Sequence, residues 1–171
     1  HDLTLVGLGV WCIGATAIAQ PTFTDASSLL PQSGSFYSWM QKGAADMDGD
    51  GYDDIVRSNT SGQFFVLKQP KTPNTPWTEM SLGGIQSGSP LSIIVGDVDN
   101  NGYCDILTGG QYNGVRIVKA SNDGTSYAAT QLPDDNIFTQ ASAMADINGD
   151  GLLDLFVCHD DGLSAIWRNT G

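Results

Sequence analysis

Short apolar runs recur along the chain between turns that are rich in glycine and aspartate. Three of these runs directly follow aspartate-rich loops: Ile55-Val56, Ile106-Leu107 and Leu155-Phe156-Val157. A glycine-containing turn (TSG, YNG or DDG) comes next, and then a second β-rich run, QFFVLK, VRIVKA or LSAIWR. Two β-rich runs joined by a short glycine turn predict a hairpin after every loop.

Further strands are expected on both sides of these hairpins. An apolar run precedes each loop, most plainly in LSIIVGDV, and a fourth run lies in WTEMSL and in SYAATQL. About four strands in every ~50 residues is the size of one propeller blade. We therefore expect an all-β fold of three propeller-type blades, with about four antiparallel strands each. The units fall at about 21–84, 85–133 and 134–171, after an apolar segment at 1–20.

The aspartate-rich loops align with one another at spacings of 51 and 49 residues. A fixed period of this size is typical of solenoids and propellers. Oxygen-bearing side chains occupy loop positions 1, 3, 5 and 9, glycine occupies position 6, and the position-7 residue offers its carbonyl. The candidate metal ligands are Asp46, Asp48, Asp50, Tyr52 and Asp54; Asp97, Asp99, Asn101, Tyr103 and Asp105; and Asp146, Asn148, Asp150, Leu152 and Asp154.

These oxygen-only loops favour calcium over other metals. Ca²⁺ takes about six to eight oxygen ligands in flexible geometry, whereas Mg²⁺ demands a tighter octahedron and keeps its waters. Thiol and imidazole ligands are missing, which disfavours zinc and copper. We predict about three bound calcium ions, and the alternative is three solvated Asp-Gly turns without metal.

The main rival structure is the EF-hand, whose loop begins with the same pattern. Its position 12 is a bidentate glutamate that enters a helix. Position 12 here is Arg57, Thr108 or Val157, and the residues around it favour a strand. The loops are therefore expected to join strands.

The D-x-[DN]-x-[DN]-G-x-x-D loop, followed by a short apolar strand and repeated at this period, resembles the FG-GAP/VCBS repeats. Those repeats occur in integrin alpha-chain propellers and in many secreted bacterial proteins. The resemblance covers residues 21–171 and implies blades with a calcium ion in the loop between a blade's first two strands. It carries the ligand role to positions 1, 3, 5 and 9 of each loop. The asparagines Asn101 and Asn148 predict weaker binding in the second and third loops.

The charge of the chain limits its partners. Nineteen acidic and seven basic residues give a net charge of -12, and eleven of the acids lie in the three loops. This balance disfavours nucleic acid or an anionic membrane as a partner. The motifs G-x-S-x-G, P-loop and H-E-x-x-H are absent, and His159 in VCHDDG is expected to be a solvated hairpin residue. We therefore expect no enzymatic activity.

Several single residues are candidates for binding or covalent modification. Trp77, in the proline-rich loop at 68–80, either stacks on a sugar or a partner protein or packs on its own blade. Asn59 begins a glycosylation sequon at a hairpin tip. Cys12, Cys104 and Cys158 lack CxxC spacing and are expected to be buried or reduced small hydrophobes, with a Cys104–Cys158 disulfide as the alternative.

The N-terminal segment is apolar and uncharged from Leu3 to Gln20, and Ala17-Ile18-Ala19 has the form of a signal-peptidase site. It is either a cleaved secretory signal or a strand or helix buried in a neighbouring subunit, with a membrane anchor the least expected reading. Secretion suits calcium binding, because calcium is millimolar outside cells. The expected localisation is extracellular.

The number of units leaves the expected propeller open. Propellers have about four to eight blades, whereas three loops are present here, and the third unit stops at WRNTG before a fourth strand. An extra extended segment, PTFTDASSLL, precedes the first unit. Either such N-terminal residues complete the open unit of the next subunit in a head-to-tail fibre or ring, or the chain is part of a longer propeller. We predict a secreted calcium-binding structural protein; an adhesion or carbohydrate-binding module is the alternative.

Overall fold

The computed structural model describes residues 23–31, 43–133 and 136–171. These residues form an all-β fold in which the one helical element is a short 3₁₀ turn, η1 (Ser27–Leu29). All strands are short. In chain order they are β1 (Gly43–Ala45), β2 (Asp54–Ser58), β3 (Gln63–Lys68), β4 (Thr78–Gly84), β5 (Pro90–Gly96), β6 (Asp105–Gly110), β7 (Val115–Ala120), β8 (Tyr127–Gln131), β9 (Thr139–Ala145), β10 (Asp154–His159) and β11 (Ala165–Trp167).

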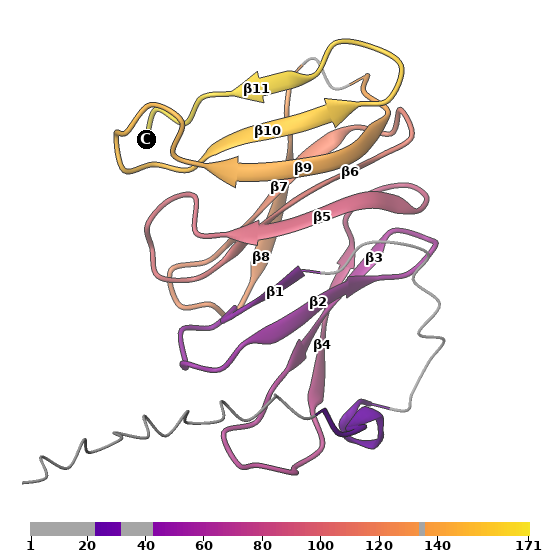
Figure 1. Cartoon of the computed structure of the whole chain (residues 1–171), viewed down its shortest axis with the longest axis vertical. Helices are drawn as coiled ribbons and strands as arrows, with labels where there is room; N and C mark the ends of the chain where they lie inside the picture. The colour runs from indigo at the N-terminus through magenta and orange to yellow at the C-terminus, as the bar shows by residue number, and fades with distance from the viewer. Residues whose placement is uncertain (1–22, 32–42, 134–135) are drawn as a thin grey trace, which may run out of the picture.

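The strands form three antiparallel sheets that lie one above another (Figure 1). The first sheet has the order β1-β2-β3-β4, the second β5-β6-β7-β8 and the third β9-β10-β11. The first strands are neighbours across the sheets, since β1 contacts β5 and β5 contacts β9. This is the arrangement of successive propeller blades, and it confirms the expected all-β fold of three blade-like sheets. In the described part, the third sheet ends at β11.

Two apolar clusters hold the sheets together. One lies between the first and second sheets and includes Val56 and Val66 on one side and Ile106 on the other. The second cluster lies between the second and third sheets and includes Leu107 and Leu155. Successive side chains of a strand point to opposite faces, so the neighbouring β6 residues Ile106 and Leu107 pack in different clusters. The middle sheet is covered on both faces, and every residue of β6 is buried.

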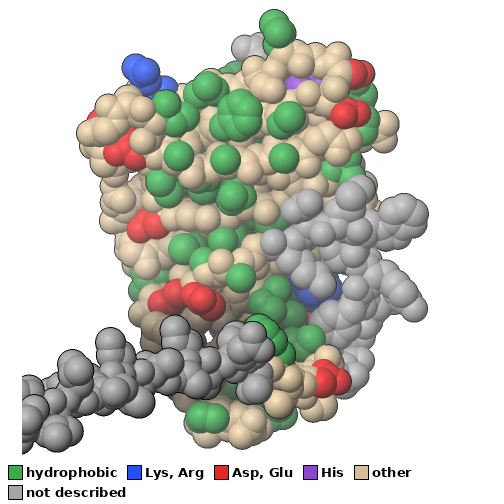
Figure 2. Space-filling view, viewed as in Figure 1, with side chains coloured by type: hydrophobic (Ala, Val, Ile, Leu, Met, Phe, Trp, Pro, Cys, Tyr) green, Lys and Arg blue, Asp and Glu red, His purple; other side chains and the backbone are tan. Residues whose placement is uncertain are grey.

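The acidic loops all join the first strand of a sheet to the second. Residues 46–53, 97–104 and 146–153 therefore lie at the same edge of the molecule, on the left in Figure 1. Acidic side chains mark that edge in the space-filling view, whereas hydrophobic side chains gather over the third sheet above (Figure 2). The turns between the second and third strands lie at the opposite edge.

One local expectation from the sequence is wrong. The stretch beginning at Phe23 is not a continuous extended segment, because Ser27–Leu29 forms the 3₁₀ turn η1. The Asp25 side chain favours this turn by accepting the N–H of Ser27 at 2.9 Å. The β-rich run LSAIWR contains β11 (Ala165–Trp167), which pairs with β10 as the expected hairpin.

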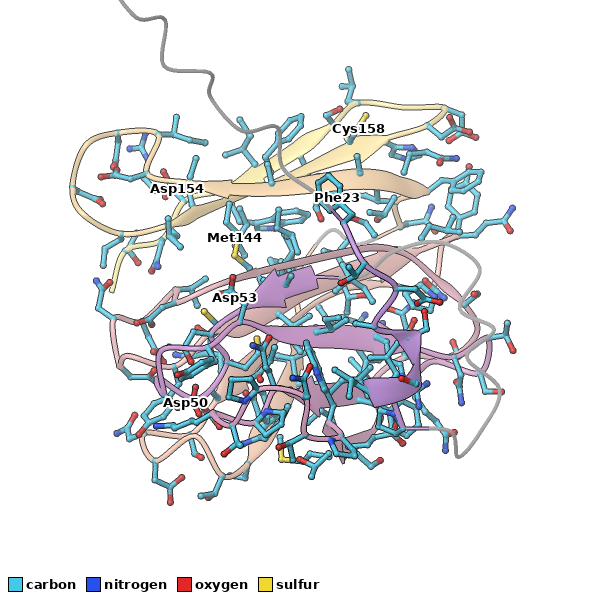
Figure 3. The ribbon with its side chains drawn as sticks, turned by 60° about the horizontal axis from the view of Figure 1, so that its bottom comes forward. Phe23, Asp50, Asp53, Met144, Asp154 and Cys158 are labelled. Atoms are coloured by element: carbon cyan, nitrogen blue, oxygen red, sulfur yellow. The ribbon has the colours of Figure 1, made fainter. Side chains whose placement is uncertain are left out.

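Cys104 and Cys158 are both free, which agrees with the main expectation of reduced cysteines and excludes the alternative of a disulfide between them. Cys104 ends the second acidic loop, whereas Cys158 is well along β10 in another sheet (Figure 3). Cys12 and the whole 1–20 segment lie outside the described residues. Within the described ranges, no helix is long and apolar enough to cross a membrane.

Candidate metal centre

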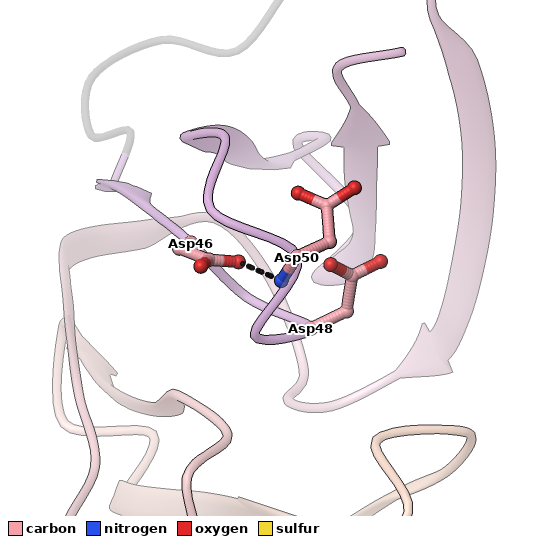
Figure 4. Close-up of side chains that lie close together, drawn as sticks. All are labelled: Asp46, Asp48 and Asp50. Atoms are coloured by element: carbon pink, nitrogen blue, oxygen red, sulfur yellow. Dashed lines mark hydrogen bonds between the residues drawn. The ribbon is translucent and has the colours of Figure 1, made fainter. Parts of the chain in front are cut away.

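The first aspartate of each acidic loop folds the turn around its own carboxylate. Asp46 Oδ1 accepts the N–H of Asp50 at 3.0 Å, and Oδ2 accepts that of Gly51 at 2.7 Å (Figure 4). The same pair of bonds forms at Asp97 (3.1 and 2.8 Å) and at Asp146 (3.0 and 2.8 Å). The position-6 glycines have φ angles of 86–89°, a left-handed conformation that glycine adopts without a Cβ clash. The predicted sharp turn at these glycines is therefore present.

The position-5 side chain closes the turn from the other side. Its oxygen accepts the N–H of the position-7 residue, at 2.9 Å from Tyr52, 2.8 Å from Tyr103 and 2.9 Å from Leu152. These backbone bonds fix the direction of the side chains at positions 1 and 5. The ligand role of the position-7 carbonyls stays a prediction.

The position-9 aspartates begin the second strand of each sheet and are almost fully buried. The exposed fraction is 2% for Asp54, 0% for Asp105 and 1% for Asp154. Asp105 accepts the N–H of Val98 at 2.9 Å and that of Ala120 at 2.7 Å. It thus joins the start of its loop to the end of the third strand.

The other two position-9 aspartates make the same kind of connection. Asp154 accepts the N–H groups of Ile147 at 3.2 Å and Asn169 at 2.8 Å. Asp54 accepts the N–H of Gln69 at 2.8 Å. Each position-9 carboxylate therefore ties its loop into the sheet, and Figure 3 shows Asp154 at the junction of the loop with β10.

Carboxylates of the first two loops converge closely enough to share a cation. Oxygens of Asp46, Asp48 and Asp50 all lie within 4.8 Å of one another, and so do oxygens of Asp97, Asp99 and Asp105. Such proximity of like charges is unfavourable without a cation. The third loop forms no group of this kind among the residues described, because Asn148 stands at position 3. Asn148 instead donates its Nδ2–H to Asp150 at 2.8 Å.

Cations from the protein itself approach two of the loops, which the sequence analysis missed. Lys68 Nζ lies 2.9 Å from Asp48, and Lys119 Nζ lies 2.7 Å from Asp99. Both lysines lie at the end of a third strand, and Arg168 holds the same repeat position in the third unit. The sequence signal was the final or penultimate basic residue of QFFVLK, VRIVKA and LSAIWR. The position-3 aspartates of the first and second loops, Asp48 and Asp99, are thus each paired with a lysine in the metal-free chain.

Burial and hydrogen bonding move the carboxyl pKa values of the loops in opposite directions. Burial raises the pKa of Asp54 to about 6 and also raises the pKa of Asp105, which two backbone N–H groups partly oppose. The pKa of Asp146, at the exposed position 1, is lowered chiefly by the N–H of Gly151. A divalent ion would favour the ionised form of the buried position-9 carboxyls.

The remaining candidate residues serve local structure. Asn59 accepts the N–H groups of Ser61 and Gln63 at 3.0 Å, while its own Nδ2–H donates to the Gln63 side chain at 2.7 Å. A glycan on Nδ2 would have to replace that last bond. Trp77 is half-buried beside β4, and its backbone N–H donates to the carbonyl of Leu29 at 2.8 Å. Glycan attachment at Asn59 and ligand binding at Trp77 stay predictions.

The sheets and loops together define a propeller-type repeat protein with an acidic turn in each blade. The FG-GAP-like repeat family matches residues 46–108 and 97–157, and these matches begin at the first aspartates of the first and second loops. Because the two matches together span more than half of the chain, the chain belongs to the FG-GAP-like repeat family. Such repeats are typical of extracellular and surface domains. No curated protein matches the chain.

Proposed function

We propose that the chain is an extracellular, non-enzymatic structural module whose three acidic loops each bind one calcium ion. The observation that carries this proposal is the convergence of three carboxylates within 4.8 Å in the first loop and again in the second. Backbone N–H groups hold the first carboxylate of each set in place before any ion arrives. All offered groups are oxygens, the ligand type that Ca²⁺ prefers.

The bound ion would contribute stability rather than chemistry. Asp46, Asp48, Asp50 and Asp54 would hold it in the first loop, and the corresponding residues would do so in the others. The ion neutralises crowded carboxylates and bridges the two strands that the loop joins. The position-9 aspartate extends this link to the third strand, through bonds such as that from the Ala120 N–H to Asp105 at 2.7 Å. Ion binding thereby stabilises three strands of a blade at once.

Thermal unfolding in calcium and in EDTA tests this role. Extracellular calcium modules bind with Kd values of about 10⁻⁴–10⁻³ M, so 10 mM is roughly 10 to 100 times Kd. Each occupied loop would then stabilise the fold by about 1.4–2.7 kcal/mol. Magnesium at the same concentration is the control and should have a much smaller effect. A melting temperature that is equal in calcium and EDTA would refute the proposal.

Self-association is the second part of the proposed function, and the exposed face of the third sheet supports it. Val66 and Ile117 hold the same position of successive repeats and are 0% and 8% exposed, because each packs against the next sheet. Ile166 holds this position in the third unit and is 60% exposed. This apolar position is buried in the first two units and exposed in the third, which indicates that the outer face of the third sheet is suited to pack against a further sheet.

A second copy of the chain supplies such a sheet in a head-to-tail assembly, as the sequence analysis predicts. Sedimentation velocity in calcium over a range of chain concentrations tests this part. Assembly should strengthen with concentration and should weaken in Ile166→Asp, a variant in an exposed position that leaves the buried core intact. Asn122→Asp, an exposed change in the turn between β7 and β8 of the middle sheet, is the charge control and should leave assembly unchanged. A single monomeric species at every concentration would refute self-association.

A further inference from the structure

An apolar cavity of about 400 Å³ opens between the second and third sheets. Its lining includes Val98, Ile117 and Leu132 from the second unit and Leu155 and Trp167 from the third. Lys119 and Arg168 also line it. Residues of the second and third acidic loops, among them Asp99 and Leu152, also contribute to its lining.

The first interface shows what is missing from this cavity. The residues at the same repeat positions there are Met47, Val66, Ile106 and Val118, and all four belong to the closed cluster between the first two sheets. Tyr127, the first residue of β8, packs against that cluster, and its hydroxyl donates to the Met47 carbonyl at 3.4 Å. The aromatic ring comes from the fourth strand of the second unit. The third sheet has no fourth strand in the described part, so its corresponding cavity lacks the ring.

The hydrogen bonds of the cavity specify which aromatic residue is suited to it. The Val98 carbonyl, at the repeat position of Met47, already accepts the side-chain N–H of Asn169 at 2.6 Å. An incoming ring therefore needs no hydroxyl, which favours phenylalanine over tyrosine. Phe23 is the most exposed large hydrophobic residue of the described part, at 93%. Exposure of a whole phenylalanine ring is unfavourable unless another surface covers it.

We propose that Phe23 of a second copy inserts into this cavity, while the residues that follow it extend along the free edge of β11. This inference rests on the proposed self-association and specifies its contact. Residues 23–26 have no regular secondary structure, and Leu29 remains tied to Trp77 of its own first sheet. Phe23 lies six positions before Leu29, so the ring can reach a neighbour while the Leu29–Trp77 hydrogen bond is kept.

The register of β8 sets the position of the inserted segment. Tyr127 pairs with Ala120, and Asn169 holds the repeat position of Ala120 in the third unit. Phe23 would therefore lie opposite Asn169, and Thr24 opposite Arg168. Directly opposed residues of paired strands share a face of the sheet, so the Phe23 ring would lie on the face of Asn169, whose side chain contacts the Val98 carbonyl at the cavity.

Photo-crosslinking of the full chain in calcium tests the contact. p-Benzoylphenylalanine replaces Phe23, and ¹⁵N-labelled and unlabelled chains are mixed before irradiation so that adducts between chains are recognised by mass. The expected adducts join the residue-23 peptide of one chain to cavity peptides that contain Leu132 or Trp167 of another. The same photoreactive residue in place of Tyr112, which is 43% exposed at the opposite edge, is the control and should give no such adduct. Adducts within one chain, or on other surfaces, overturn the proposal.

Substitutions provide a second, independent measurement. Phe23→Ala should weaken self-association by on the order of tenfold to a hundredfold, the effect of losing one buried aromatic side chain. Leu132→Trp should fill the cavity and weaken it similarly, with circular dichroism checking that the sheets remain folded. If Phe23→Ala assembles as well as wild type, this contact is refuted while the proposed function stands. If wild type itself stays monomeric, both the contact and the assembly are refuted, whereas the calcium-dependent melting still tests the metal sites.

Discussion

Two aspartates of the second loop, one buried and one partly exposed, allow a structural role to be distinguished from a metal-binding role. Asp105 is 0% exposed and accepts N–H groups from Val98 at 2.9 Å and Ala120 at 2.7 Å. Asp99 belongs to the same carboxylate group, but its side chain is 29% exposed and forms an ion pair with Lys119. Asp105→Ala and Asp99→Ala therefore both remove a candidate ligand. In the metal-free fold, however, the first removes two buried hydrogen bonds, whereas the second removes a partly exposed ion pair.

The two substitutions should have very different effects in EDTA. Each hydrogen bond to a charged group contributes about 1.5–3 kcal/mol, and two buried N–H groups would be left without an acceptor. The cost of burying the Asp105 carboxyl, reflected in its raised pKa, offsets part of this loss. We expect Asp105→Ala to reduce the free energy of unfolding by about 2–4 kcal/mol, since removing a partner from a buried charged network is strongly destabilising. In a chain of this length that lowers Tm by roughly 5–15 °C.

Asp99→Ala should change little in EDTA, because exposed ion pairs contribute only about 0–1 kcal/mol. In calcium, both variants should lose the part of the stabilisation that comes from the second loop. Differential scanning calorimetry of wild type and both variants, in EDTA and in calcium, measures the six Tm values needed. If Asp105→Ala melts with wild type in EDTA, or Asp99→Ala falls as far as Asp105→Ala, the assigned roles are wrong.

Four further predictions follow from the loops and the surface. Lys119→Gln should lower the calcium Kd of the second loop by about two- to fivefold, because the ammonium no longer competes for Asp99; an unchanged or higher Kd in calorimetric titration contradicts this. Asn148→Asp should tighten binding by the third loop in the same titration, and weaker binding would count against a cation there. In EDTA, the stability from Asp54 is full below its unfolded pKa of about 3.9 and is lost as pH rises through about 6, and Asp54→Asn should remove this part of the pH profile of urea unfolding. If Trp77 binds a sugar, Trp77→Ala should abolish signals on a glycan array, and retained signals would exclude it.

Local information was sufficient to predict the repeats and the turns. The loop ligands lie within nine residues of one another, and the glycine at position 6 follows from the backbone conformation of the turn itself. Alternating apolar residues on either side of short turns then predicted the hairpins. A loop that repeats at a fixed period gives the fold class, because each unit must bury its apolar face against the next.

The roles of single residues were less accessible from the sequence. Asp54, Asp105 and Asp154 read as ligands only, and their bonds to the end of the third strand depend on strand pairing. Lys68 and Lys119 approach the loops because the third strand runs back toward them, a consequence of the hairpin register. The sequence alone also left a Cys104–Cys158 disulfide open as an alternative, and only the placement of the two cysteines in different sheets excludes it.

The sequence by itself determined three β units, each with an acidic turn, because these features arise from short-range periodicity and from the steric needs of tight turns. Only the tertiary structure decided which faces of the sheets are closed and which stay open. Ile117 and Ile166 hold the same repeat position, yet one is buried and the other exposed. No local pattern separates them, because burial depends on whether a neighbouring sheet is present.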